Sequence, residues 1–143
     1  MDISVRNVTA EDAPYVCRIC CEDLGYECDE TLVLQRITEL DLTREVVFVA
    51  EVDGEVSGYI HGELYRTLYF ETMCNLLGLA VSRKCRRMGL GRKLVQTCEE
   101  WAKQNGVHLM RVNSGMGRTG AHDFYRDMGY TDEKEQKRFL KRL

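Results

Sequence analysis

Residues 79–94 read LAVSRKCRRMGLGRKL, an apolar stretch, a basic turn with two glycines and the start of an amphipathic segment. The apolar stretch is typical of a strand end, and the buried face of a following helix is marked by Leu90, Leu94, Cys98 and Trp101. Backbone amides in the first turn of a helix lack internal partners and lie at the positive end of its dipole. The stretch therefore predicts a strand, a turn and a helix that together bind a phosphate anion.

Two better-known phosphate loops do not fit this turn. The third glycine of a dinucleotide-binding GxGxxG is absent, because Leu94 stands where it would fall. No Gly-Lys-Ser/Thr follows, as a P-loop requires. On spacing alone, an ordinary solvated loop remains the alternative.

The chain before this turn predicts three strands and two helices. Thr9 can cap the first helix, which runs to about Leu24 and has Pro14 near its first turn. Asp53-Gly54 is a hairpin signal that makes the second and third strands antiparallel. In chain order the other elements are a strand Ile3–Val8, a helix Thr31–Leu40 and strands Glu45–Val52 and Val56–Tyr65.

The rest of the chain continues the alternation of strands and helices, and it contains no internal repeats or linkers. The third strand has Ser57, Tyr59, His61, Glu63 and Tyr65 on one face, which is unusually polar. The order predicts one α/β (α+β) domain over residues 1–143. Its later elements are a strand Thr72–Val81, a helix Gly89–Asn105, a strand His108–Asn113, a helix Gly120–Met128 and a strand Gln136–Leu143.

Composition excludes several classes of protein. The net charge of -3 gives no general cationic surface for nucleic acid, and no apolar run has the roughly 18 residues of a membrane helix. Without a secretory signal at Met1–Arg6, we expect a cytoplasmic protein whose seven cysteines are free thiols. Cys17 and Cys20 form a lone CxxC, so no metal site is predicted, and Cys17, Cys20 and Cys21 are interpreted as helix-core residues.

Two motifs resemble those of the GNAT superfamily of N-acetyltransferases. Arg86–Gly91 matches its Arg/Gln-x-x-Gly-x-Gly/Ala signature and follows the family's Leu-Ala-Val strand. Ala121–Tyr130 resembles the later pattern Ala-x-x-Phe/Leu-Tyr-x-x-x-Gly-Phe/Tyr. The resemblance covers nearly the whole chain and is nearest to the aminoalkylphosphonate, or small-amine, branch. It implies a GNAT fold with a mixed, mostly antiparallel sheet flanked by about four helices.

The resemblance also implies an acetyl-CoA site. The strand end would offer backbone groups to the pantetheine arm and acetyl carbonyl, where it parts from its neighbour near Ser114, and the turn would hold the pyrophosphate. Small and aromatic side chains at Ala121, Phe124 and Tyr125 would line the other side. The residues implied along the strand and turn are Leu79, Ala80, Val81, Arg86, Arg87, Met88, Gly89, Leu90, Gly91 and Arg92.

Direct transfer to an amine needs a proton donor for the departing thiolate and a base for the amine. Tyr125 is the predicted donor, since a phenol is protonated at neutral pH; packing within its helix is the alternative. The family's strand glutamate is missing, because Cys74, Asn75 and Gly78 occupy that strand. Glu63 or His61 could relay a proton through water, although each alone is more readily a structural residue.

The prediction is therefore an acetyl-CoA-dependent transferase that acts on a primary amine, preferably of a small molecule. Acidic residues near Glu27 would favour a cationic acceptor, or form an ordinary solvated surface. Acetylation of a protein or peptide, and a degenerate acyl-CoA-binding regulatory module, remain alternatives. Because many family members dimerise, a homodimer is also compatible with the sequence, which indicates no interface.

Overall fold

The computed structural model describes residues 1–143. The chain divides into two compact units, residues 1–112 and 113–143, each described by itself below. The first unit contains five strands and three α-helices. In chain order these are β1 Ile3–Asn7, α1 Ala13–Asp23, α2 Glu30–Thr38, β2 Glu45–Val52, β3 Glu55–Tyr65, β4 Met73–Val81, α3 Leu90–Gln104 and β5 Met110–Val112.

The sheet of the first unit has the order β1-β2-β3-β4-β5. Neighbouring strands from β1 to β4 are antiparallel, and β4 pairs with β5 in parallel. The hairpin at Asp53-Gly54 joins β2 and β3, and both residues have positive φ angles, 51° and 85°. The mixed, mostly antiparallel sheet predicted from the resemblance is thereby confirmed.

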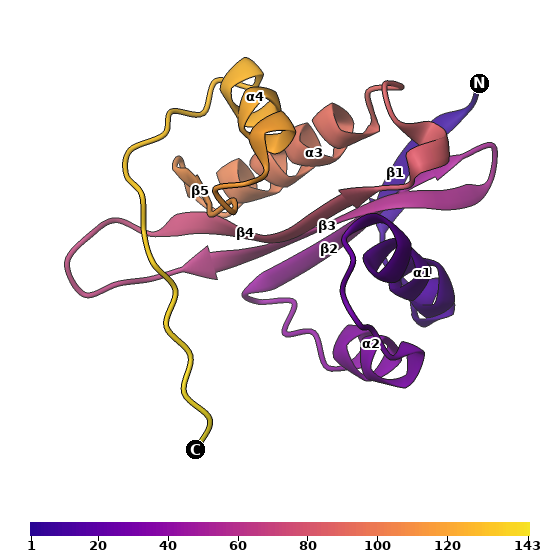
Figure 1. The fold of residues 1–143 in the computed structure, drawn as a ribbon, viewed down its shortest axis with the longest axis horizontal. Helices are drawn as coiled ribbons and strands as arrows, with labels where there is room; N and C mark the ends of the chain where they lie inside the picture. The colour runs from indigo at the N-terminus through magenta and orange to yellow at the C-terminus, as the bar shows by residue number, and fades with distance from the viewer. The chain divides into compact units, whose positions relative to one another are not determined.

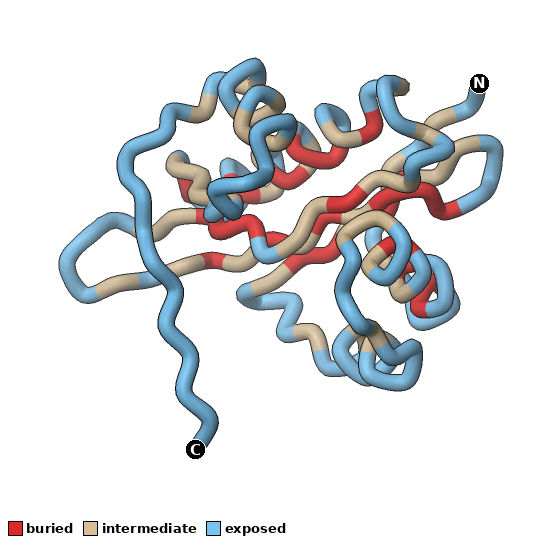
Figure 2. The backbone as a smooth tube through the Cα atoms, viewed as in Figure 1, coloured by how far each residue is buried: buried red, intermediate tan, exposed pale blue.

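Helices cover both faces of this sheet, with α1 and α2 on one side and α3 on the other (Figure 1). On the α3 side, glycines let the helix approach closely. A Cβ atom at Gly62 would lie 2.7 Å from Cys98 Sγ, and one at Gly58 would lie 3.2 Å from Leu94 Cδ1. The buried residues follow the central strands and α3 (Figure 2).

The face under α1 combines apolar packing with a partly buried ion pair. Val16, Val49 and Val56 form a buried cluster there. Asp12, which precedes α1, accepts hydrogen bonds from the Arg6 guanidinium at 2.8 and 2.9 Å and from the Thr9 amide at 2.7 Å. The predicted helix start is thus correct, although residues Ala10–Asp12 form a 3₁₀ turn before α1.

The second unit contains one helix, α4 Thr119–Asp127, which agrees with the predicted Gly120–Met128 within a residue at each end. The predicted strand Gln136–Leu143 is wrong: these residues form no strand, and all of them are exposed. Its apolar members, Phe139 and Leu140, are 86% and 79% exposed. A strand needs a neighbour to pair with, and the sheet order ends at β5.

The helices of the structure are short or amphipathic. None of them combines the length and the apolar character that crossing a membrane requires. The four α-helices match the number expected from the resemblance.

Candidate functional site

The turn between β4 and α3 presents unpaired backbone amides. Gly89 precedes α3 with a φ of 81°, and no side chain caps the helix. The first hydrogen bond of the helix runs from the Lys93 amide to Gly89 O at 3.0 Å, so the amides of Leu90, Gly91 and Arg92 precede it. Arg87 also has a positive φ, 66°. Amides at a helix N-terminus are suited to bind an anion.

The turn is held by a carboxylate from another helix. Asp23, near the end of α1, accepts a hydrogen bond from the Arg83 amide at 3.0 Å. Its side chain is 3% exposed and pairs with the guanidinium groups of Arg83 and Arg86 at 3.5 and 4.0 Å. Arg87 and Arg92 are exposed and form no ion pair, so their charges are available to a bound phosphate.

The strand that leads into this turn is irregular. A bulge in β4 lies beside His61, since His61 is opposite Gly78 and Gly62 is opposite Leu76. Pairing with β5 ends at Leu76 and Val112, whereas β4 continues to Val81. The edge of β4 from residue 77 to residue 81 therefore has no strand partner on the β5 side, and its backbone groups can bond to a ligand.

The polar face of β3 lies on the side of α1 and α2. Tyr59 is opposite Ala80, and its ring covers Gly78, where a Cβ atom would lie 3.1 Å from the phenol oxygen. Burial, with a hydrogen bond to the Cys20 thiol, raises the pKa of Tyr59 well above its ordinary value. The phenol is therefore neutral at physiological pH.

Next to it, His61 forms a pair with a carboxylate that the sequence analysis missed. His61 Nε2 lies 2.9 Å from Glu45 Oε1, and both side chains are about one-quarter exposed. Such a partner orients an imidazole and favours the form in which the carboxylate accepts from Nε2–H. His61 also lines a cavity of about 170 Å³ with Tyr59 and residues of α1 and α2, including Val16 and Val33.

Glu63 belongs to a second series of polar contacts, which crosses three strands. Asn75 donates to Glu63 Oε1 at 3.3 Å, and Arg111 of β5 donates to Asn75 Oδ1 at 2.9 Å. The Arg111 guanidinium lies over the Tyr65 ring, 4.6 Å from its centroid. Asn75 is buried, so this series of hydrogen bonds both fixes the register of the strands and positions Glu63.

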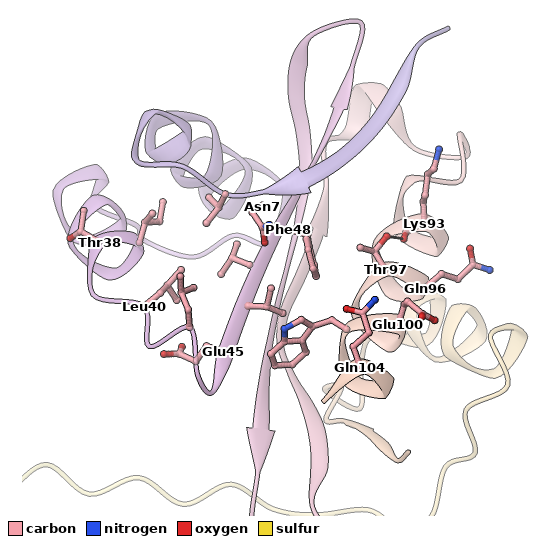
Figure 3. Close-up of a pocket in the computed structure, with 16 residues that line it drawn as sticks. Asn7, Thr38, Leu40, Glu45, Phe48, Lys93, Gln96, Thr97, Glu100 and Gln104 are labelled. Atoms are coloured by element: carbon pink, nitrogen blue, oxygen red, sulfur yellow. Dashed lines mark hydrogen bonds between the residues drawn. The ribbon is translucent and has the colours of Figure 1, made fainter. Parts of the chain in front are cut away.

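A larger hollow than the cavity beside His61 lies at the sheet edge where β1 ends. Its volume is about 930 Å³, and its walls come from α2, β2 and α3 (Figure 3). Thr38 and Leu40 line one side, and Thr97 and Glu100 line the other. Of residues 79–94, only Lys93 lines this hollow, so it lies apart from the glycines of the β4–α3 turn.

In the second unit, the predicted residues Ala121, Phe124 and Tyr125 share one face of α4. The Tyr125 ring contacts Phe124 and Tyr130, with ring centroids 5.2 and 5.7 Å apart. Burial raises the pKa of Tyr125, with a smaller opposing effect from Arg118, so its hydroxyl carries a proton at neutral pH. Ser114 Oγ is buried without a hydrogen-bond partner and is thus available to a ligand.

The structure also corrects the interpretation of the early cysteines. All seven cysteines are free, but Cys21 is exposed and is not a helix-core residue, while Cys17 and Cys20 are half-buried. Hydrophobic spacing could not separate these positions, because α1 turns one side to solvent at Cys21. Glu45, Asp23 and Arg111 were missed since their partners lie on other strands or helices.

A mixed sheet whose strand β4 leads through a basic glycine turn into the N-terminus of α3 defines an α/β domain with a candidate anion-binding site. The sequence model of the acetyltransferase (GNAT) family matches residues 7–130, and the chain belongs to this family.

Similar proteins include the aminoalkylphosphonate N-acetyltransferase of Salmonella typhimurium, 30% identical over 97% of this chain and 90% of that protein. Among solved structures, the aminoglycoside 6'-N-acetyltransferase AAC(6')-Ih of Acinetobacter baumannii has a TM-score of 0.85 at 18% identity, covering 99% of both chains. AAC(6')-Iy, in complex with a bisubstrate analogue of CoA, has a TM-score of 0.84 at 15% identity and covers 100% of both.

The matched region spans 53% of the length of one further relative and 39% of another. The structural likenesses, all below 25% identity, show the fold.

Proposed function

We propose that this protein transfers an acetyl group from acetyl-CoA directly to the primary amine of a small molecule. The observation that carries the proposal is the β4–α3 turn, with three amides ahead of the first helical hydrogen bond and two unpaired arginines. A pyrophosphate matches this set of donors. Family membership supports acetyl-CoA as the molecule that brings the pyrophosphate.

Residues of this chain fit acetyl-CoA at several points. The amides from Arg87 to Arg92 would hold the pyrophosphate, and Arg86 and Met88 would shape the turn around it. The unpaired edge of β4 at Leu79–Val81 would bond to the pantetheine arm, and the bulge at Gly78 would place an amide near the acetyl carbonyl. Ser114, Ala121 and Phe124 would complete the site. When bound, acetyl-CoA supplies the acetyl thioester.

His61 accepts the proton of the acceptor amine in this proposal. Glu45 holds Nε2, which leaves Nδ1 to accept a proton through water. The neighbouring cavity under α1 and α2 could admit a small amine. Glu63 is the alternative base, but Asn75 already donates to its carboxylate and lowers its availability.

Tyr125 gives its proton to the departing thiolate. Its raised pKa keeps the hydroxyl protonated until thiolate charge develops. The proton balance is then complete, because the amine loses one proton toward His61 and the thiolate gains one from Tyr125.

The acceptor class rests on size and charge. The cavity beside His61, about 170 Å³, suits a small group better than a folded protein surface. A relative of similar length acts on aminoalkylphosphonates, which are small amines. Acidic residues near the α1–α2 connection, Glu22, Glu27 and Glu30, would attract a cationic amine.

The test combines cofactor binding with a broad amine screen. Acetyl-CoA should raise the melting temperature, and a panel of small amines should release free CoA thiol, detected with a chromogenic disulfide. Peptide libraries analysed by mass spectrometry test the protein-acetylation alternative. Binding of acetyl-CoA without acetylation of any amine or peptide would favour a regulatory module, and absence of binding would overturn the proposal.

Replacing Tyr125 with Phe should lower kcat about 100-fold, while acetyl-CoA affinity stays within twofold, because the lost hydroxyl acts on the leaving thiolate. Tyr130→Phe is the matched control, since it removes the hydroxyl of the ring that packs against Tyr125. Unchanged turnover in Tyr125→Phe, with chemistry shown to limit the rate, contradicts the role of Tyr125.

The single domain predicted for residues 1–143 is part of this proposal. No residue from 113 to 143 is fully buried, although several are half-buried, so this unit has no core of its own and is too short to fold alone. Seven free cysteines support a reducing, cytoplasmic location.

A further inference from the structure

Three cysteine thiols meet where α1 ends and α2 begins. Cys17 and Cys21 lie one turn apart on α1, and Cys28 lies in the connection just before α2. The three Sγ atoms all lie within 4.8 Å of one another. Cys20, the other member of the sequence CxxC, points elsewhere and bonds to the Tyr59 hydroxyl at 3.2 Å. The grouping therefore differs from the one that the sequence motif indicates.

Both helix thiols are directed at the third cysteine. Cys17 donates to the Cys28 carbonyl at 3.3 Å, and Cys21 donates to the same oxygen at 3.6 Å. The connection is fixed at each end. The Tyr26 amide bonds to Cys20 O at 3.1 Å, and the Asp29 carboxylate caps α2 by accepting from the Thr31 amide at 2.9 Å. The position of Cys28 thus follows from backbone bonds on both sides of it.

From this geometry we infer that Cys17, Cys21 and Cys28 form a thiolate site for a soft d¹⁰ divalent cation of the Zn²⁺ class. A tetrahedral ion with Zn–S bonds of about 2.3 Å holds its sulfur ligands about 3.8 Å apart. Closing gaps of at most 4.8 Å requires small side-chain rotations. Exposure of Cys21 gives the ion access from solvent.

The fourth ligand position is open to water or to the Glu30 carboxylate. Glu30 begins α2 and lies near enough to Cys17 to interact with it electrostatically. Other acidic side chains in the same segment, Glu22 and Glu27, raise the local concentration of divalent cations. A site with three protein ligands and one exchangeable position results.

The Cys17 and Cys28 thiols are protonated when no ion is bound. Burial, with the hydrogen bond to Cys17, raises the pKa of Cys28 to about 12, and burial raises the pKa of Cys17 as well. Three thiolates around one M²⁺ give the complex a net charge of -1, and binding releases the protons of Cys17 and Cys28. Affinity therefore rises with pH. Protonated thiols are also poor nucleophiles, which makes a redox role less suited to this cluster.

A bound ion would connect the end of α1 to the start of α2 and fix the intervening connection. This site is distinct from the anion-binding turn, and the inference does not depend on acetyl transfer. The site gives a ligand role to Cys17, Cys21 and Cys28, for which the sequence alone indicated no chemistry.

The test uses the reduced full-length chain with Co²⁺ and Zn²⁺. Co²⁺ should give a thiolate-to-metal charge-transfer band that saturates at one ion per chain and disappears when Zn²⁺ displaces it. With Zn²⁺ present, alkylation followed by mass spectrometry should show slowed labelling at Cys17, Cys21 and Cys28, and unchanged labelling at Cys20 and Cys85.

Single substitutions distinguish a site formed by Cys17, Cys21 and Cys28 from one formed by the CxxC pair, Cys17 and Cys20. Cys21→Ser and Cys28→Ser should each weaken Zn²⁺ binding at least tenfold, while Cys20→Ser should change it less than twofold. If a variant fails to fold, labelling of the unmodified chain still decides the question. Lack of saturable binding, protection centred on Cys17 and Cys20, or an equal loss in Cys20→Ser would overturn the inference.

Discussion

His61 and Gly62 are neighbours in the chain but lie on opposite faces of the sheet. His61 faces α1 and α2, is about one-quarter exposed and bonds to Glu45. Gly62 faces α3, where a Cβ atom would meet Cys98 Sγ at 2.7 Å. One face of β3 therefore holds groups that can move protons, and the other holds a close-packed core. Because successive side chains of a strand point to opposite faces, a few residues of β3 contribute to both the polar face and the packed face.

Substitutions along β3 from Gly58 to Leu64 should therefore divide by the face that each side chain occupies, since the register shift at Ala50/Glu51 leaves Val56 on the α1 side. Changes on the α3 face should affect folding, and changes on the other face should affect turnover.

His61→Gln should lower kcat/KM about 100-fold, as expected when a general base is lost. The amide can still bond to Glu45, so the free energy of unfolding should change by less than about 0.5 kcal/mol. Steady-state kinetics with an identified amine and urea denaturation provide both measurements. Glu63→Gln is the matched control on the same face, and a larger loss in that variant would assign the base to Glu63.

Gly62→Ala should lower the free energy of unfolding by about 2.5 kcal/mol, because the added methyl group overpacks the contact with Cys98. Turnover per folded molecule should stay near that of the unmodified chain. Urea denaturation measures the loss. Cys98→Ala clears this space, so it should lower the free energy of unfolding less in the Gly62→Ala background than in the unmodified chain. If the two losses simply add, α3 already adjusts to the added methyl group.

Asp12→Asn should cost about 2 kcal/mol at pH 7, since it removes the charged acceptor of the Arg6 guanidinium. Hydrogen bonding from Arg6 holds the pKa of Asp12 below its ordinary value of 3.8. The carboxylate thus stabilises the fold above about pH 4 and loses this effect as the pH falls through its lowered pKa. Unfolding measured from pH 7 to pH 2 should show the two proteins converging at acid pH.

This variant also sharpens the comparison of faces. Asp12 lies on the side of α1 but is buried, with its side chain 5% exposed. Its loss should change stability without changing kcat. A kcat decrease in folded Asp12→Asn would show that face alone, and not burial, decides the role of a polar group.

Gly89→Ala should weaken acetyl-CoA binding about tenfold, because a left-handed backbone costs an alanine roughly 1–2 kcal/mol. Calorimetry measures the affinity. Gly106→Ala is the matched control, with a φ of 74° at the opposite end of α3. Equal effects of the two variants on affinity would place the pyrophosphate away from the turn.

The sequence predicted the local features well, because their causes are local. Residues 79–94 contain the strand, the glycine of positive φ and the helix start within one short stretch. The bounds of β2 agree to the residue, since its apolar run ends at a hairpin signal. The missing final strand was a failure of the same method, because a pattern of side chains cannot supply a pairing partner.

Contacts between distant residues were decided by the tertiary structure alone. The Glu45–His61 pair spans 16 positions, and Asp23 reaches the Arg83 amide across 60. Cys28 joins Cys17 and Cys21 because the connection to α2 folds back over α1, whereas the sequence motif favoured Cys20. Sequence spacing thus determined the turn between β4 and α3, where local backbone geometry suffices. Chain folding decided which side chains lie close enough to exchange a proton or bind an ion together, because those interactions require atoms within a few ångströms.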